Sequence, residues 1–260
     1  MSGNLMAAVG SGSVVGFMLG LLGGGGSILA TPLLLYVVGV TQPHIAIGTG
    51  ALAVSANAFA NFASHATKGH VWWRCAVVFA VLGSIAAIGG STLGKAMDGS
   101  HLLFLFGLLM LVIATLMLRR RTNADTPTRP VDARMCLFTS AVAIVSGMAA
   151  GFFGIGGGFL IVPGLMLATG MPMISAVGSS LLAVGAFGLA TAANYALSGM
   201  VDWMLAAEFI GGGVGGGMVG MFLATRLAGY KNVLSRLFAI VIYAVAAYIL
   251  YRSVSDFIGR

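Results

Sequence analysis

Long apolar runs separated by short polar stretches make up most of the chain. A bilayer crossing takes about 17 to 25 apolar helical residues, and most of the runs are of that order. They are continuous rather than alternating in polarity, which predicts transmembrane helices and argues against a barrel. The runs are Leu5–Leu22, Ile45–Thr67, Cys75–Leu93, Leu102–Leu118, Met135–Phe153, Ile174–Leu197, Trp203–Ala224 and Val233–Tyr251.

Two further apolar pieces, Ile28–Val38 and Phe159–Thr169, are too short to cross, and each follows a group of glycines. A helix of eleven residues rises only about 16 Å, roughly half the thickness of the hydrocarbon core. Each glycine-broken element is therefore predicted to be either a broken helix or a re-entrant hairpin.

The glycine groups belong to a sequence that occurs twice. Six positions of the first copy recur 131 residues later, counted from Gly16 to Gly147. They are Gly16, Gly20, Gly23, Gly25, Gly26 and Pro32, which return as Gly147, Gly151, Gly154, Gly156, Gly157 and Pro163. The following helices match at a shift of 130, for example at Gly48 and Gly178 and at Trp73 and Trp203.

The repeat divides the chain into two homologous halves. Residues 1–118 form the first helical repeat, residues 119–134 a hydrophilic basic linker, and residues 135–260 the second repeat. We predict an all-α polytopic membrane protein in which each repeat has a glycine-broken or re-entrant first element and three spanning helices.

Composition and charge support a membrane protein. Hydrophobic residues are 59% of the chain, charged residues 7%, and the mean hydropathy is +1.03, values that exclude an ordinary soluble domain. Most of the 13 Lys and Arg residues lie between the apolar runs, a pattern typical of membrane topology signals. No basic, aromatic-interleaved soluble face is present, so nucleic acid is not an expected partner. The lipid bilayer is an expected partner, and we expect a multi-pass protein of the cell (inner) membrane.

The distribution of basic residues bears on the orientation of the repeats. If each repeat crosses four times, nine basic residues share the linker face and four the other face. If the broken elements are re-entrant, each repeat crosses three times, the repeats are inverted, and the division becomes ten against three. The positive-inside rule favours the inverted arrangement, with the linker in the cytoplasm and both termini outside, and leaves the eight-span alternative open.

The doubled glycine and proline motif and the arginine-bearing central linker resemble the sulfite exporter TauE/SafE family of membrane permeases over essentially the whole chain. The resemblance implies a carrier of small anions such as sulfite or organosulfonates. One departure is that the first motif reads Gly23-Gly24-Gly25-Gly26-Ser27, whereas the second keeps the more usual Gly154-Ile155-Gly156-Gly157-Gly158.

The glycine breaks are the main candidate for substrate binding. A glycine run interrupts the helical hydrogen bonds, and a half-helix beginning at Ser27 or Phe159 directs its positive dipole end at the break. Such a site binds an anion without a charged side chain. The alternative is that the glycines only permit close helix packing, the interpretation we favour for Gly211–Gly220. A phosphate-binding loop is a weak match, because no strand precedes the motif.

Polar positions on the helix after each motif give a second signal. Asn57, Asn61, Ser64 or His65, and Lys68 share one helical face, and Asn61, Ser64 and Lys68 correspond to Thr191, Asn194 and Ser198. These stripes are predicted to line a path, although polar side chains also hold membrane helices together. The candidate substrate-binding residues are Gly23, Gly24, Gly25, Gly26, Ser27, Thr49, Asn57, Asn61, Gly154, Gly156, Gly157, Gly158, Ser179, Ser180 and Asn194.

Further candidates are Glu208, a carboxylate within an apolar run, and His65, both for proton coupling; Pro32 and Pro163 are expected to be structural. No catalytic constellation, metal-ligand spacing or cofactor motif is present. The predicted function is secondary transport of a small anion by alternating access, not catalysis. A passive anion channel and a membrane-embedded assembly or sensor component are the alternatives, and homo-oligomerisation is left open.

Overall fold

The computed structural model describes residues 2–69, 71–119, 133–169, 171, 173–226 and 231–258, and every regular element within them is a helix. The first half contains α1 (Ser2–Leu22), the 3₁₀ helix η1 (Gly23–Leu29), α2 (Ala30–Tyr36), α3 (Pro43–Thr67), α4 (Trp73–Ala96) and α5 (Gly99–Arg119). The second contains α6 (Ala133–Phe153), α7 (Gly158–Thr169), α8 (Met173–Ala196), α9 (Trp203–Arg226) and α10 (Lys231–Ile258). The all-helical fold is confirmed. Most of the linker, 119–134, lies outside the described residues.

The first glycine group differs from its prediction in one respect. The second half-helix does not begin at Ser27, because the chain turns at Gly23, where φ is +73°, and then forms η1 through the remaining glycines. Glycine adopts a positive φ without steric cost, and the tighter 3₁₀ helix is common at helix termini. The second half-helix, α7, begins at Gly158, one residue before Phe159.

Four helices in the described residues are long and apolar enough to cross a membrane, within α3, α4, α8 and α9. Shorter apolar helices lie within α1, α5, α6 and α10. At about 1.5 Å per residue, the 12 residues of α7 span about 18 Å, too little to cross the core alone.

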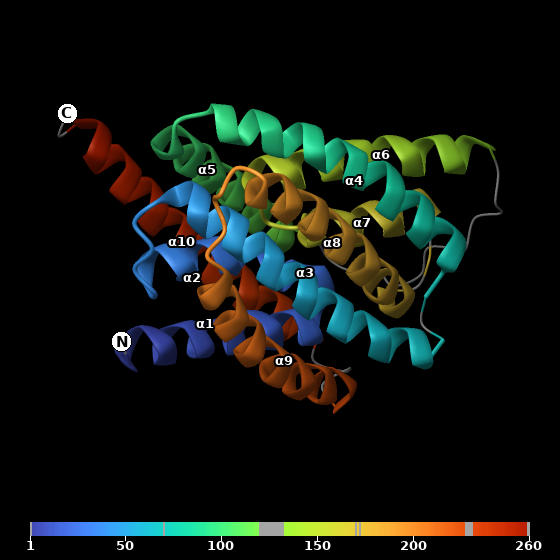
Figure 1. The fold of residues 1–260 in the computed structure, drawn as a ribbon. Coiled ribbons are helices and arrows are strands. Elements are labelled where there is room, and N and C mark those ends of the chain that lie inside the picture. Colours follow the sequence, from blue (N-terminus) through green and yellow to red (C-terminus); the bar gives the residue numbers. More distant parts are fainter. Residues whose placement is uncertain are drawn as a thin grey trace.

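The helices run between two ends of the molecule. We call the end that carries both termini the terminal end (Figure 1), and the opposite end the linker end. Leu5, near the start of α1, lines the same pocket as Val38 and Gln42, which follow α2. The unit of α1, η1 and α2 therefore enters from the terminal end and returns to it, as a re-entrant hairpin does.

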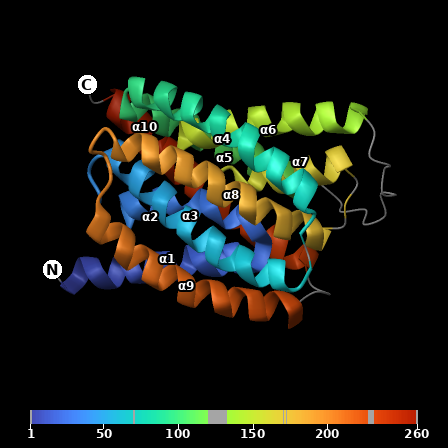
Figure 2. The same cartoon turned by 45° about the vertical axis from the view of Figure 1, so that its right-hand side comes forward.

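The two halves run in opposite directions. Helices α1 and α9 pack in parallel, with Gly12 against Phe209 and Gly20 against Gly217. Helices α4 and α6 also pack in parallel, with Gly83 against Gly147 and Gly94 against Phe152. Because α9 starts at the terminal end and α4 starts at the linker end, α1 and α6 are antiparallel, as Figures 1 and 2 show.

Glycine allows the backbones of these pairs to touch. A Cβ added at Gly16 would overlap the backbone of Gly213, and one at Gly147 would overlap the backbone of Gly83. The two contacts involve matching positions of the two repeats. Small residues at helix interfaces are typical of membrane proteins, and five glycines of α9 pack closely against neighbouring helices as predicted, whereas Gly211 and Gly215 have nothing near them among the described residues. The five are Gly212, Gly213, Gly216, Gly217 and Gly220.

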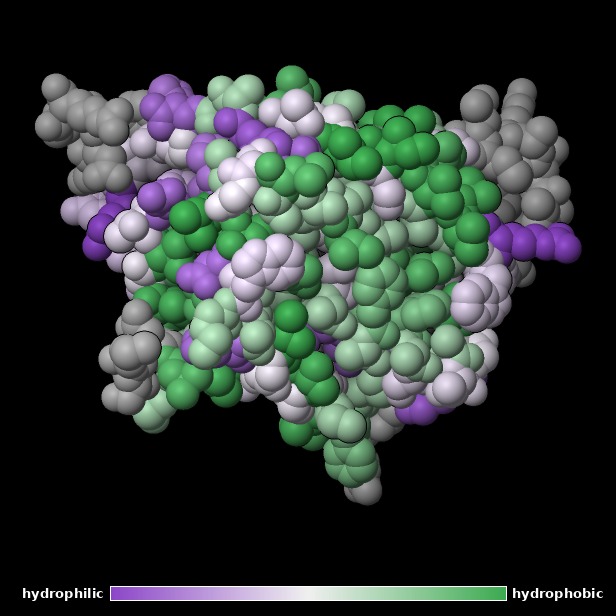
Figure 3. Space-filling model, in the orientation of Figure 1, coloured by the Kyte–Doolittle hydropathy of each residue, from purple (hydrophilic) through white to green (hydrophobic). Residues whose placement is uncertain are grey.

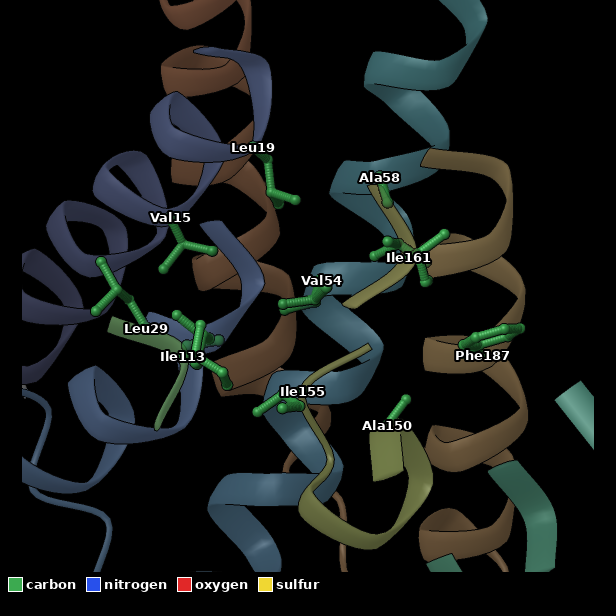
Figure 4. Close-up of a cluster of buried hydrophobic side chains, with 14 of the residues drawn as sticks. Val15, Leu19, Leu29, Val54, Ala58, Ile113, Ala150, Ile155, Ile161 and Phe187 are labelled. Carbon is green, nitrogen blue, oxygen red and sulfur yellow. The ribbon is translucent and has the colours of Figure 1, made fainter. Parts of the chain in front are cut away.

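Helices α3 and α8 cross at the centre of the molecule. Ser55 donates a hydrogen bond of 2.7 Å to the carbonyl oxygen of Gly185, the residue 130 positions later and hence its own counterpart. Because Ser55 and Gly185 are counterparts in the two repeats, their contact lies close to the approximate two-fold axis that would relate the repeats. Figure 4 shows the surrounding core, in which Val54 and Ala58 of α3 share one apolar cluster with Ile155 and with Phe187 of α8.

Large apolar side chains are also exposed on the outer faces of the helices, among them Ile85, Leu93, Met218 and Phe222. In the view of Figure 3, hydrophobic residues cover the middle of the face and hydrophilic ones gather toward the ends. An outer surface of this kind is suited to contact with lipid.

Candidate substrate site

The two glycine breaks have sharply turned backbones. Gly23 opens the first break at a φ of +73°, while Gly154, Gly156 and Gly157 in the second have φ values of +67°, +64° and +66°. An L-residue rarely adopts these conformations, so the turns require glycine. Gly23, Gly24 and Gly26 are buried, and Gly154, Gly156 and Gly157 are buried as well.

The breaks are in direct contact with each other. A Cβ added at Gly24 would overlap Cα of Gly158, and a Cβ added at Gly158 would overlap the backbone of Gly24. Two segments 134 positions apart, from residue 24 to residue 158, therefore meet with no side chain between them. The sequence predicted two breaks but did not establish that they meet.

Aliphatic side chains of α3 and α8 surround the contact. Gly156 lies between Val54 and Val184, with added-Cβ distances of 3.3 Å and 3.1 Å to their Cγ1 atoms. Gly23 packs against Val177 of α8, and Gly154 packs against Ile47 of α3. Both pairs join matching positions of the repeats, so the breaks have similar apolar walls on the two sides.

Polar groups at the breaks come from the main chain. The first N–H groups of a helix have no partner within it, and α7 begins at Gly158 where the breaks touch. The hydroxyl of buried Ser27 donates a hydrogen bond of 2.8 Å to the carbonyl oxygen of Gly24, so this predicted ligand is used within η1. Gly25 is partly buried in η1.

The predicted hydroxyls of α3 and α8 lie at helix starts of the opposite half. Thr49 Oγ1 accepts a hydrogen bond of 3.0 Å from the N–H of Asp202, and Ser179 Oγ accepts one of 3.0 Å from the N–H of Trp72. The two bonds join matching positions of the repeats and satisfy N–H groups at the starts of α9 and α4. Ser180 donates to the carbonyl oxygen of Val177. In the structure, all three hydroxyls therefore have hydrogen-bond partners within the protein.

The polar stripe of α3 faces α9. Asn57 is fully buried, and neither its Nδ2 nor its Oδ1 atom has a hydrogen-bond partner in the described part of the chain. One turn further on, Asn61 donates from Nδ2 to the carbonyl oxygen of Asn57 at 2.9 Å. Gly213 and Gly217 of α9 leave room for the two amides. A buried amide without partners has unused capacity to bind a polar ligand.

A pocket of about 430 Å³ lies between α3 and α9 at the outer end of this stripe. Asn61, Ser64 and Lys68 supply its polar groups, and Met218, Met221 and Phe222 are among its apolar ones. The structure thus brings together a cation, a hydroxyl and an amide at the linker end.

Two polar residues of the matching stripe of α8 are hydrogen-bonded to Lys95, a residue that the sequence did not single out. Lys95, in the last turn of α4, donates from Nζ to the carbonyl oxygen and Oδ1 of Asn194 and to Oγ of Ser198, at 2.9, 2.8 and 2.8 Å. The predicted end of this helix at Leu93 left Lys95 outside the run. Its i,i+4 relation to Ser91 was the available signal.

The proton-coupling candidates are separated. His65 is buried in the last turn of α3. Glu208 is half-buried in α9 and lines a pocket of about 500 Å³ at the terminal end, together with Asp202. Pro32 is buried in α2, and Pro163 lies within α7. The described residues contain no group of three His, Cys, Asp or Glu side chains that could hold a metal ion.

Comparison with known proteins agrees with the architecture. The family model described as "Sulfite exporter TauE/SafE" matches residues 8–249. A "Probable membrane transporter protein" of Xylella fastidiosa (strain 9a5c) is 61% identical over 251 residues, covering 96% of each chain. Two proteins of Bacillus subtilis (strain 168) are more distant. "Probable membrane transporter protein YjnA" is 31% identical, covering 84% of this chain and 89% of its own, and "Probable membrane transporter protein YunE" is 26% identical, covering 83% and 87%. No solved structure matches the chain.

The doubled glycine motif, the helical bundle and a family match over nearly the whole chain agree, and the protein is a multi-pass membrane transporter that belongs to the sulfite exporter TauE/SafE family.

Proposed function

We propose that the protein is a secondary carrier of sulfite or another sulfur-containing oxyanion or sulfonate, and that the anion binds where the two glycine breaks meet. The contact between Gly24 and Gly158 carries the proposal. It puts the start of α7, whose first N–H groups have no partner within the helix and whose dipole end is positive, beside a second turned backbone. Irregular backbone at membrane depth is tolerated where it lines a cavity or is buried in protein.

The distribution of charge supports an anionic rather than a cationic substrate. The acidic residues whose side chains the structure describes are Asp98, Asp202 and Glu208, and none of them belongs to the glycine breaks or to α3, α7 or α8. An anion at the breaks would meet backbone dipoles and aliphatic walls without a nearby carboxylate. Electrostatic interactions are stronger in such apolar surroundings than in water.

The opposed halves support alternating access. In many carriers, repeats related by an axis in the membrane plane rock about a site at their interface. Here the breaks touch each other, and Ser55 bonds to its counterpart Gly185 close by in the core. A site at this position belongs equally to both halves, so it can face either side in turn.

The basic residues support a cytoplasmic linker end. Ten of the 13 lie in or beside segments that reach the linker end: Lys68, Arg74, Arg119, Arg120, Arg121, Arg129, Arg134, Arg226, Lys231 and Arg236. The positive-inside rule then assigns the linker end to the cytoplasm and the terminal end to the outside of the inner membrane.

Flux into proteoliposomes tests the proposal. Labelled sulfite, thiosulfate and methanesulfonate are offered to the purified protein, and a saturable uptake of at least one is expected. Absence of saturable flux for every anion contradicts the proposal. Counterflow then separates a carrier from a channel, since only a carrier lets unlabelled substrate inside the vesicles drive a transient accumulation of labelled substrate above its outside concentration. An assembly or sensor component would give no flux in either assay.

A further inference from the structure

Two crevices in the molecule occupy matching positions in the two repeats. One lies between α3 and α9 at the linker end, and the other between α8 and α4 at the terminal end. In the first, Ser64 donates a hydrogen bond of 2.8 Å to Sδ of Met221. In the second, Asn194 donates one of 2.6 Å to Oγ of Ser91. Asn194 lies 130 positions after Ser64, and Met221 lies 130 positions after Ser91, so one bond is the repeat counterpart of the other.

The crevices differ in state. The crevice between α3 and α9 contains a pocket of about 430 Å³. Its counterpart is closed by a polar network in which Asn194 Nδ2 donates to Ser91 and Thr92 of α4, while Asn194 Oδ1 accepts from Lys95. These bonds join the ends of α4 and α8. The contact between α3 and α9 thus borders a pocket, whereas the matching contact between α4 and α8 is joined by a polar network.

Lys95 is the residue of this network that an anion would engage. An ammonium group has three protons to donate, and the three hydrogen bonds of Lys95 go to the neutral oxygens of Asn194 and Ser198. In the part of the chain that the structure describes, no acidic side chain pairs with it. The present hydrogen bonds of Lys95 are charge-assisted through the ammonium donor alone, and an oxyanion would add the Coulomb attraction of an opposite charge, which is stronger in apolar surroundings than in water. An oxyanion therefore offers Lys95 stronger acceptors than those it now has.

We propose that Lys95 closes a gate between α4 and α8, and that an oxyanion opens the gate by taking over the hydrogen bonds that Lys95 gives to Asn194 and Ser198. Lys68, in the open crevice, receives the anion at the linker end. This gating rests on the proposed carrier function and adds a second oxyanion site to the one at the breaks. In the structure, the gate between α4 and α8 is then in its closed state.

A buried hydroxyl lies behind the closed gate. Thr191 Oγ1 is fully buried and has no hydrogen-bond partner within the described ranges. Its repeat counterpart, Asn61, lines the open pocket. Asn61 is 4% exposed and borders the pocket, whereas Thr191 is fully buried, so the two form a matched pair of reporter positions at the same place in the two repeats.

Cysteine accessibility in nanodiscs tests the gate without requiring transport. In a background with Cys75→Ser and Cys136→Ser, Asn61→Cys and Thr191→Cys are reacted with a small neutral maleimide. Asn61→Cys is expected to react at least tenfold faster. Addition of sodium methanesulfonate, with sodium chloride as the ionic-strength control, is expected to raise the rate at Thr191→Cys several-fold. Lys95→Met is expected to raise it without any anion, whereas the matched change Lys68→Met is expected to leave it unchanged.

Equal rates at Asn61→Cys and Thr191→Cys in the absence of anion overturn the proposal. So does a rate at Thr191→Cys that responds neither to methanesulfonate nor to Lys95→Met. If Lys95→Met does not fold, Lys95→Arg in the Thr191→Cys background replaces it. Arg keeps the charge, so the gate is expected to stay closed without anion and to open with it, and failure of both overturns the gate. Flux without an accessibility change refutes the gate alone, and an anion-dependent accessibility change without flux refutes the carrier function alone.

Discussion

The replacement Asn57→Leu separates a structural from a functional role for the polar stripe of α3. Asn57 is fully buried, and both polar atoms of its amide lack a hydrogen-bond partner among the described residues. Leu has nearly the shape of Asn and carries no polar atom. We therefore expect Asn57→Leu to stabilise the substrate-free protein and to impair transport.

The size of each effect follows from the contacts. Leaving a buried donor or acceptor unpaired costs about 1–3 kcal/mol. Hydrogen bonds within membranes average about 0.6 kcal/mol, which places the expected gain near the lower limit, about 1 kcal/mol. A hydrogen bond to a charged ligand contributes about 1.5–3 kcal/mol. Its loss from a transported anion corresponds to a decrease of about tenfold or more in flux at subsaturating anion.

Thermal unfolding in detergent and anion uptake into proteoliposomes measure the two effects on the same preparation. Asn61→Leu is the matched control one turn away, because Asn61 donates a hydrogen bond to the carbonyl oxygen of Asn57. It is expected to lose stability rather than gain it. The difference in sign between neighbouring Asn→Leu changes is specific to an amide that is unpaired in the substrate-free state.

A less stable Asn57→Leu protein with unchanged flux would refute this reasoning. The amide would then be a structural group, and the stripe would hold α3 against α9 without touching substrate.

Three further changes test other parts of the structure. Gly24→Ala is expected to abolish uptake, because its Cβ would overlap Gly158. Gly215→Ala in α9 is the control, since nothing lies within 4 Å of its added Cβ. Equal uptake by the two variants would argue against the contact. Thr49→Ala and Ser179→Ala each remove a hydroxyl that accepts an N–H at a helix start, and thermal unfolding should report similar losses of about 1 kcal/mol; a loss in only one would argue against the matched roles. If the Glu208 carboxylate carries a coupled proton, Glu208→Gln is expected to abolish anion-driven proton movement and to preserve counterflow. A pH-sensitive dye inside the vesicles follows the proton movement. Undiminished proton movement would assign the coupling to another residue.

The sequence by itself determined the membrane class, the helices and the positions of the breaks. Apolar runs near bilayer length are satisfied as helices in lipid, so the predicted Ile45–Thr67 and Trp203–Ala224 became α3 (Pro43–Thr67) and α9 (Trp203–Arg226). The recurring glycines of α9 also predicted a packing face, because spacing alone places Gly213 and Gly217 on one side of a helix.

Only the tertiary structure decided what the polar residues do. A hydroxyl in an apolar helix must find a partner, and which partner is within reach depends on segments far away in the chain. Thr49 and Ser179 were predicted to surround an anion and instead accept hydrogen bonds from Asp202 and Trp72. The sequence did not reveal the role of Lys95, because its acceptors, Asn194 and Ser198, come from the other half. The meeting of Gly24 with Gly158 has the same cause, since a sequence records each break separately and only the packing of the two halves brings them into contact.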